Sequence, residues 1–101
     1  MKKPYIVIPA LDPDQHLLEL IDSITTGDPE WNHYLGIIVV DDGSRLPDVF
    51  QQLADRHRVH VLRHEQNKGK GAALRTAFNW IIKQSDERCS GAVTADADGQ
   101  H

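Results

Sequence analysis

Leu35–Ser44 reads LGIIVVDDGS, and this stretch decides the fold class. Its first six residues are apolar apart from one glycine, and they do not alternate with polar residues. Such a run is typical of a parallel strand that helices cover on both faces. Two carboxylates, a glycine and a serine follow at once. The stretch therefore predicts a buried strand at Leu35–Asp42 that ends in a polar turn.

Further apolar runs alternate with helical patterns on both sides of this strand. The other predicted strands are Tyr5–Ile8, Val59–Arg63 and Gly91–Ala95. The predicted helices carry apolar residues at helical spacing. The first begins at Pro13, after an Asp12 cap, has an apolar stripe that continues to Ile24, and is ended by Gly27 and Pro29; the others run from Val49 to Ala54 and from about Lys70 to Gln84. The β-α-β-α-β-α-β order predicts an α/β fold in which helices cover both faces of a mostly parallel sheet.

The composition excludes several classes of protein. The 101 residues suffice for one domain, and 40% apolar with 26% charged residues is ordinary for a globular chain. The 11 basic and 15 acidic side chains give a net charge of −4, which argues against non-specific nucleic-acid binding. No apolar run approaches the about 20 residues of a membrane span. The single cysteine, Cys89, excludes an internal disulfide, and we expect a cytoplasmic protein.

The unusual residues gather where the predicted strands end. In open α/β sheets, ligands bind outside the carboxyl ends of the strands. The residues at those ends are Pro9, Ala10, Leu11 and Asp12; Asp41, Asp42, Gly43 and Ser44; Arg63, Asn67, Gly69, Lys70 and Gly71; and Asp96, Ala97 and Asp98. The sequence therefore predicts a ligand site at one edge of the sheet, built from carboxylates, cations and a glycine-rich turn.

Two of these motifs have both a structural and a functional interpretation. VVDDGS is either a polar turn, or a site where Asp41 or Asp42 accepts hydrogen bonds from a base or a ribose. Gly69 and Gly71 open a helix, where backbone N–H groups and the helix dipole favour an anion. A GxG pair before a helix is also a common tight turn, and the Walker A pattern is not matched.

The closing DADGQH motif suggests a metal site. Two carboxylates at i and i+2, Asp96 and Asp98, can reach one hard divalent cation such as Mg²⁺ or Mn²⁺, which then bridges phosphate oxygens of a substrate. Gln100 and His101 offer further contacts. The alternative is a polar turn after the strand. An EF-hand is excluded, because its further ligands and its Glu at loop position 12 do not follow.

Three histidines cluster near the third predicted strand. His60 and His64 would share one face of that strand, and His57 lies just before it. No carboxylate or cysteine spacing completes a zinc pattern. We therefore expect all three to be solvated surface residues.

Four segments together resemble the family 2 glycosyltransferases, which have the Rossmann-like GT-A fold. They are VIPA after the first strand, VVDDGS after the second, NKGKGAALRTA at the third helix, and DADGQH as the DxD motif. The resemblance covers nearly the whole chain and is closest to the branch of polyprenyl-phosphate sugar synthases. It implies sugar transfer from a UDP- or GDP-sugar to a lipid-phosphate or saccharide acceptor, with inversion at the anomeric carbon.

The resemblance also implies roles for individual residues. Pro9 and Ala10 would lie along the base and ribose, and Leu11 and Asp12 stand where family members often have an aromatic residue and Asn. Asp41, with or without Asp42, would read the base. Arg63 and Lys70 would lie near the donor, with Asn67, Gly69 and Gly71 shaping the loop. Asp96, next to Ala97, would face the ribose or the metal, and Asp98 would bind the Mg²⁺ or Mn²⁺.

The family's acceptor site and general base lie beyond the DxD motif. We therefore expect residues 1–101 to be the donor-binding part, truncated after that motif, with weak nucleotide binding and no transfer activity of their own. An exposed sheet edge would allow a homodimer. The full-length protein would work in the cytoplasm, at the inner face of the membrane if it has membrane segments.

Two other classes of protein remain open from the sequence. One is a nucleotidyltransferase with a related sheet and a metal-bound nucleotide, although IPALDPD lacks that class's glycine-rich loop after the first strand. The other is a non-catalytic α/β module, which would bind no nucleotide sugar with or without Mn²⁺.

Overall fold

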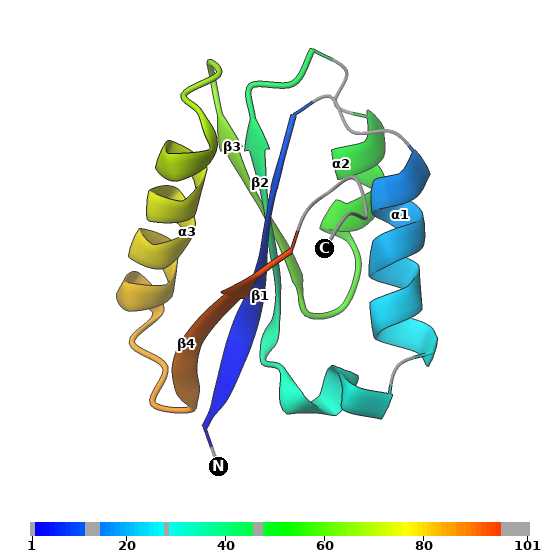
Figure 1. The fold of residues 1–101 in the computed structure, drawn as a ribbon, viewed down its shortest axis with the longest axis vertical. Helices are drawn as coiled ribbons and strands as arrows, with labels where there is room; N and C mark the ends of the chain where they lie inside the picture. Colours follow the sequence, from blue (N-terminus) through cyan, green and yellow to red (C-terminus); the bar gives the residue numbers. More distant parts are fainter. Residues whose placement is uncertain (1, 12–14, 28, 46–47, 96–101) are drawn as a thin grey trace.

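The computed structural model describes residues 2–11, 15–27, 29–45 and 48–95 (Figure 1). The elements in chain order are β1 (Lys3–Ala10), α1 (Gln15–Asp22), the π-helical η1 (Ser23–Gly27), the 3₁₀-helical η2 (Pro29–His33), β2 (Gly36–Asp42), α2 (Asp48–Ala54), β3 (Val59–His64), α3 (Lys70–Gln84) and β4 (Cys89–Thr94). This order confirms the predicted alternation of strands and helices. In the described part of the chain, no helix is long and apolar enough to cross a membrane.

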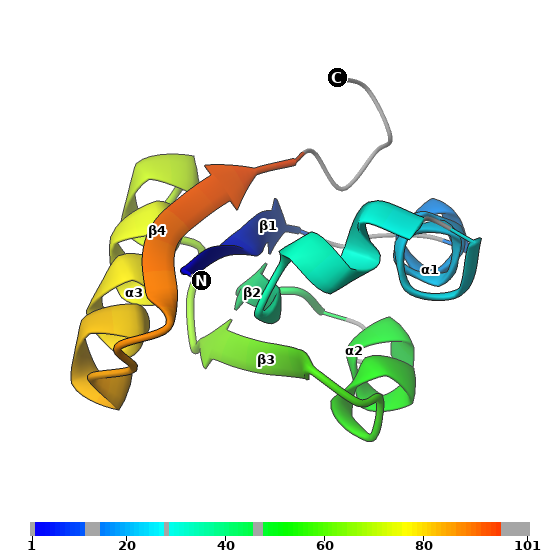
Figure 2. The same ribbon diagram turned by 90° about the horizontal axis from the view of Figure 1, so that it is seen from below.

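The four strands form one parallel sheet with the order β3-β2-β1-β4 (Figure 2). All strands therefore point the same way, and the carboxyl ends of β1, β2 and β3 reach one edge. The register aligns Ala10 of β1 with Asp41 of β2, and Asp41 with Arg63 of β3. Residues far apart in the sequence thus meet in one row across the sheet.

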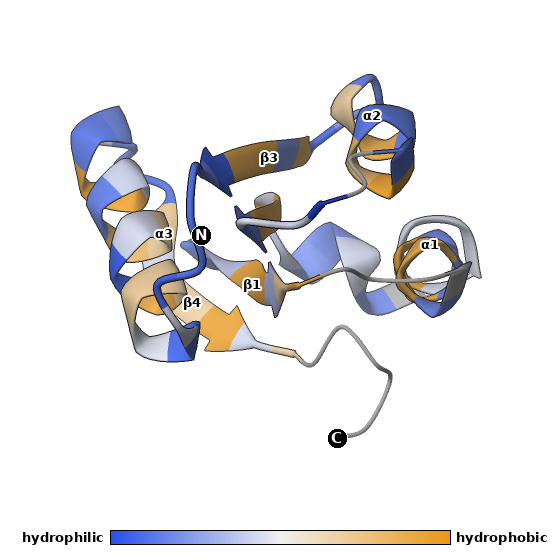
Figure 3. Cartoon of the chain, turned by 90° about the horizontal axis from the view of Figure 1, so that it is seen from above, coloured by the Kyte–Doolittle hydropathy of each residue, from blue (hydrophilic) through white to orange (hydrophobic). Residues whose placement is uncertain are grey.

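Helices cover both faces of the sheet, as predicted. Alternate residues of each strand face opposite sides. Ile6 and Ile8 of β1 pack in a core with α1 and α2, whereas Tyr5 and Val7 pack in a second core with Ala73 and Ala77 of α3. Every residue of β2 is buried, which confirms the reading of LGIIVVDD as a strand covered on both faces. Figure 3 shows the apolar residues concentrated on the strands and on the inner sides of α1 and α2.

The first helix ends earlier than its apolar pattern predicts. The pattern continues to Ile24, but α1 ends at Asp22 and the chain continues as η1. The hydroxyls of Thr25 and Thr26 donate to the carbonyls of Ile21 and Asp22, at 2.9 and 2.6 Å. Such side-chain bonds compete with regular helical hydrogen bonding and distort the last turn. The predicted cap at Asp12 and Pro13 lies outside the described residues.

Arg58 holds the connection that leads into β2, a feature that the sequence did not predict. Its guanidinium donates to the carbonyls of Trp31, Tyr34 and Leu35, and it lies 4.1 Å from the centre of the Trp31 ring. These carbonyls belong to η2 and the turn after it, which the guanidinium therefore fixes against the start of β3.

Candidate functional site at the carboxyl edge of the sheet

The structure brings several predicted site residues together at the carboxyl edge. Ala10, Asp41 and Arg63 lie in one row, with Ala10 and Asp41 buried and Arg63 largely exposed. Pro9 lies opposite Val40 one step earlier, and Leu11 is exposed. The predictions for Asp12, Asp96, Ala97 and Asp98 concern positions outside the described residues.

The two adjacent aspartates at the end of β2 point to opposite faces of the sheet. Val39 belongs to the core beneath α1 and α2, and Val40 belongs to the core beneath α3. Because side chains alternate along a strand, Asp41 lies on the same face of the sheet as Val39, and Asp42 lies on the same face as Val40. The two carboxylates are therefore separated and enter different environments.

Asp41 keeps a buried acceptor atom. Its side chain is fully buried, and Oδ1 accepts from the backbone N–H of Ser44 at 2.8 Å. Within the described residues, Oδ2 has no hydrogen-bond donor, and the Nε of Arg63 lies 3.4 Å away. At that distance the guanidinium supplies an electrostatic attraction rather than a well-formed hydrogen bond. A buried carboxylate oxygen without a donor is costly, which makes Oδ2 a candidate acceptor for a ligand.

Asp42 instead ties a loop to the sheet. Oδ1 accepts from the backbone N–H of Lys68 at 2.9 Å and contacts Nδ1 of His64 at 2.8 Å. Oδ2 accepts from the backbone N–H of Gly69, also at 2.9 Å. Both oxygens are thus engaged. Between the two aspartates that could read a base, the geometry favours Asp41.

The loop that Asp42 holds is residues 67–71, which we call the glycine loop. Gly69 precedes α3 with a φ of +93°, a conformation that glycine adopts readily, and its N–H also contacts Oδ1 of Asn67 at 3.0 Å. Lys70 and Gly71 are exposed in the first turn of α3. Their predicted contacts with a donor stay predictions, and the N–H groups of Lys68 and Gly69, just before them, bind Asp42.

Gly43 allows the chain just before this loop to approach β2. Its φ is +84°, and a Cβ at this position would lie 2.5 Å from the backbone nitrogen of Asn67 and 2.6 Å from the carbonyl carbon of Gln66. The turn after β2 and the glycine loop are therefore packed backbone to backbone. The VVDDGS motif predicted Gly43 only as part of a polar turn.

The prediction that His64 is a solvated surface residue is wrong. We expected a solvated histidine, but its side chain is only 7% exposed, with Nδ1 on Asp42 and Nε2 2.7 Å from Oγ1 of Thr76. His60 is also partly buried, and its ring packs against Trp80. The expectation holds for His57, which is exposed. The signal that could have indicated their burial is the strand face that His60 and His64 share, because α3 covers that face of the sheet.

Acid should destabilise this edge through Asp42. Burial alone would raise the pKa of its carboxyl group, but hydrogen bonds from Lys68, His64 and Gly69 outweigh burial, and the pKa falls below its usual 3.8. A carboxyl group with a lowered folded-state pKa stabilises the fold above its unfolded-state pKa, and that stabilisation is lost as the pH falls through the folded-state pKa. The free energy of unfolding in urea should therefore decrease from about pH 5 downward. Asp42→Asn should weaken this decrease, and an unchanged pH profile in the variant would contradict the assignment to Asp42.

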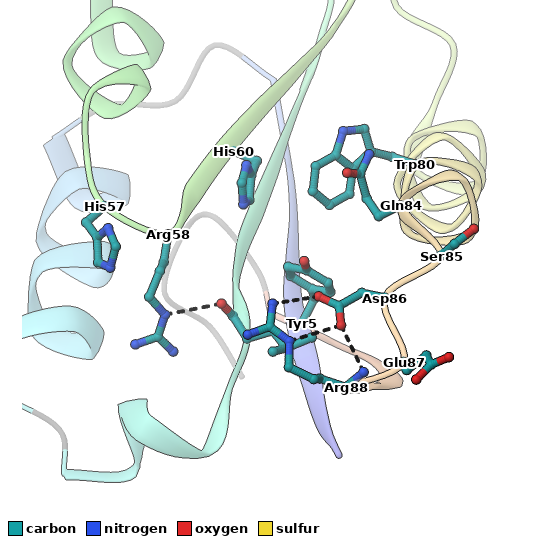
Figure 4. A pocket seen from close by; sticks show the side chains of 11 residues that line it. Tyr5, His57, Arg58, His60, Trp80, Gln84, Ser85, Asp86, Glu87 and Arg88 are labelled. Atoms are coloured by element: carbon teal, nitrogen blue, oxygen red, sulfur yellow. Dashed lines mark hydrogen bonds and ion pairs between the residues drawn. The ribbon is translucent and has the colours of Figure 1, made fainter. Parts of the chain in front are cut away.

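A separate hollow of about 810 Å³ lies at the other end of the sheet (Figure 4). Tyr5 and His60, near the starts of β1 and β3, face Trp80 of α3, with ring centres 5.6 and 4.7 Å from the indole. At its rim, Asp86 and Arg88 form an exposed ion pair of 2.8 Å. The rings join the end of α3 to the sheet, and the hollow is distant from the carboxyl edge.

Comparison with known proteins gives relatives whose names refer to dolichyl, polyprenyl or undecaprenyl phosphates and their sugars. The chain is 30% identical over 112 residues to UDP-N-acetylglucosamine--dolichyl-phosphate N-acetylglucosaminyltransferase of Methanococcus voltae, covering 96% of this chain and 41% of the relative. It is 31% identical over 105 residues to polyprenol monophosphomannose synthase of Mycolicibacterium smegmatis, covering 99% and 37%. It is 35% identical over 103 residues to undecaprenyl-phosphate 4-deoxy-4-formamido-L-arabinose transferase of Pseudomonas savastanoi, covering 95% and 28%.

The chain thus spans between 28% and 41% of the length of these relatives. The family described as glycosyl transferase family 2 matches residues 5–101. That match extends from the third residue of β1 through the DxD motif and takes in every segment of the candidate site. The chain therefore belongs to glycosyl transferase family 2.

Proposed function

We propose that this chain is the donor-binding part of a glycosyltransferase that moves a sugar from a nucleoside-diphosphate sugar to a polyprenyl phosphate. The observation that carries the donor site is the buried Oδ2 of Asp41, an acceptor without a donor among the described residues. Family membership and the lipid-phosphate substrates in the relatives' names support the reaction class. Family membership also argues against a nucleotidyltransferase.

Asp41 would recognise the base. Uracil and guanine each present a ring N–H, and a carboxylate is an acceptor at neutral pH. Oδ1 is already held by Ser44, so the carboxylate is oriented before the ligand arrives. Burial strengthens such a hydrogen bond, because water does not compete for the acceptor. Ala10 and Pro9, on the neighbouring strand, would form the wall beside the base and ribose.

The positive charges at the same edge would face the diphosphate. Arg63 is 57% exposed and keeps its guanidinium next to the carboxyl edge. The N–H groups that open α3 carry the positive end of the helix dipole, which favours phosphate. Lys70, the first residue of α3, would add a further charge.

Asp96 and Asp98 would hold a divalent cation. Within the described ranges, no three His, Cys, Asp or Glu side chains are grouped to hold a metal ion. The ligands would come from the DxD motif and from substrate oxygens, and these hard oxygen donors suit Mg²⁺ or Mn²⁺. When bound, the cation would stabilise the charge that develops on the leaving nucleoside diphosphate.

The acceptor site and the general base would lie in the part of the full-length protein that corresponds to the region of the relatives that this chain does not span. The full-length protein would then act where polyprenyl phosphates are available, at the inner face of the membrane. The donor part alone would bind nucleotide without transferring sugar.

Calorimetric titration with UDP, GDP and their sugars, with and without Mn²⁺, tests this function. We expect one nucleotide to bind, and Asp41→Asn to weaken that binding by about 10-fold or more, because a hydrogen bond to a charged group is lost. Asn at this position can still accept from Ser44, and the variant removes a buried charge, so its free energy of unfolding should not fall. Asp98→Asn should remove only the Mn²⁺-dependent part of the binding.

Asp86→Asn is the matched control, because Asp86 lies at the opposite end of the sheet and should not affect the affinity. Nucleotide binding that Asp41→Asn leaves unchanged would contradict the assigned site. A folded chain that binds none of the nucleotides under any condition would favour the non-catalytic module.

A further inference from the structure

We infer that His64 is a positioning residue that acts through Asp42 to hold the glycine loop against the nucleotide site. This inference rests on the proposed function for its effect on affinity. His64 lies on β3, Asp42 on β2 and the glycine loop at the start of α3, so the three elements meet at this one contact. The role goes beyond the residues that the motifs indicate, since His64 itself would not touch the donor.

The contacts form a continuous chain from α3 to the loop. A carboxylate only accepts hydrogen bonds, so Nδ1 of His64 carries the proton that it shares with Oδ1 of Asp42, at 2.8 Å. Nε2 then faces Oγ1 of Thr76 at 2.7 Å, and the hydroxyl restrains the ring from the other side. His64 and Asp42 are 7% and 5% exposed, so water does not compete for these bonds.

The orientation of Asp42 decides where the glycine loop lies. Its two oxygens bind the consecutive N–H groups of Lys68 and Gly69, each at 2.9 Å. Both contacts require the carboxylate plane to keep one direction, and the imidazole of His64 supplies the third contact that sets it. Loss of the imidazole would allow the carboxylate to rotate and release one of the two N–H groups. Lys68 and Gly69 lead directly into the first turn of α3.

The hydrogen bonds link a carboxylate, a histidine and a hydroxyl, as in a hydrolase triad, through Asp42, His64 and Thr76. The structure does not support Thr76 as a nucleophile. Thr76 lies in the middle of α3, where backbone N–H groups are engaged in helical hydrogen bonds. Such a site offers no oxyanion hole, which acyl transfer requires. The network therefore orients groups and does not react.

Two amide substitutions of His64 separate its two contacts. An Asn side chain places its N–H₂ near the position of Nδ1, so His64→Asn should keep the hydrogen bond to Asp42. A Gln side chain places its amide near Nε2, so His64→Gln should contact Thr76 and leave Asp42 without its third donor. We expect His64→Gln to weaken nucleotide binding by about 10-fold, and His64→Asn by no more than about 3-fold.

The backbone amide resonances of Lys68 and Gly69 provide a readout that needs no nucleotide. These resonances should shift in His64→Gln and stay near their wild-type positions in His64→Asn. Thr76→Val, which keeps the shape of the side chain and removes the hydroxyl, should shift them less than His64→Gln, and it serves if the His64 variants fail to fold. Ile21→Val, in the other core, should lower stability without moving either resonance.

The outcomes distinguish this inference from the proposed function. If the wild-type chain binds no nucleotide, the proposed function fails, and the two amide resonances alone decide whether His64 positions the loop. If His64→Gln lowers only the free energy of unfolding, and leaves both the resonances and the affinity unchanged, His64 is merely a core residue and the inference is overturned. Equal effects of the Asn and Gln variants would also overturn it.

Discussion

Gly43→Ala should destabilise the protein by about 3 kcal/mol and abolish nucleotide binding, because a clash and an unfavourable backbone conformation act together. The new Cβ would lie 2.5 and 2.6 Å from backbone atoms of Asn67 and Gln66, which cannot rotate away as a side chain could. The φ of +84° adds strain of its own for a residue with a Cβ. Urea unfolding followed by circular dichroism measures the first effect, and calorimetric titration measures the second.

Two other glycines separate these causes. Gly69 has a φ of +93° but open space around it, so Gly69→Ala should cost about 1 kcal/mol from backbone strain alone. Gly27 has no positive φ, and among the described residues no atom beyond its chain neighbours and its own helix would lie within 4 Å of a new Cβ, so Gly27→Ala should not lower the unfolding midpoint. The close approach of the glycine loop to β2 would be wrong if Gly43→Ala cost no more than Gly69→Ala.

Asp42→Ala should cost about 3–5 kcal/mol, because it leaves buried and partly buried donors without an acceptor. The N–H of Lys68 and the Nδ1 of His64 would lose their partner, and the N–H of Gly69 would keep only Oδ1 of Asn67. We also expect faster hydrogen exchange at the Lys68 and Gly69 amides, because the loop is no longer tied to β2. Urea unfolding and amide exchange measured by NMR check the two effects.

The matched control replaces Asp86, an aspartate that is partly exposed. Asp86 pairs with Arg88 on the surface, and water can replace that contact, so Asp86→Ala should leave the unfolding midpoint and the exchange of the loop amides unchanged. Similar stability losses in Asp42→Ala and Asp86→Ala would show that the Asp42 contacts do not cause the loss of stability.

The fold could be predicted because its signals are local. The bounds of α3, Lys70–Gln84, match the predicted helix, since a long apolar stripe that begins after a glycine is a clear local signal. The strand at β2 was recognised from an apolar run that only a sheet covered on both faces accommodates. The 3₁₀ turn at η2 was missed, because it depends on Arg58, whose donors reach back 23 to 27 residues along the chain.

The candidate site was predicted in part. The carboxyl edge follows from the alternation of strands and helices and from the position of the motifs, whereas the row of Ala10, Asp41 and Arg63 depends on the register of the sheet. Which aspartate keeps a usable acceptor did not follow, because VVDDGS places both in the same turn. His64 was misjudged for a related reason: its neighbours in the sequence are polar, whereas its neighbours in space are Asp42 and Thr76.

The sequence by itself determined the alternation of elements, the parallel sheet and the edge at which its unusual residues gather, since these depend on periodicity and on the order of motifs along the chain. The tertiary structure alone decided that Asp41 retains a buried acceptor while Asp42 holds the glycine loop. The physical reason is the register between β2 and β3, which sets Asp41 beside Arg63 on one face and Asp42 beside His64 on the other. Two chemically identical neighbours thereby acquire different partners.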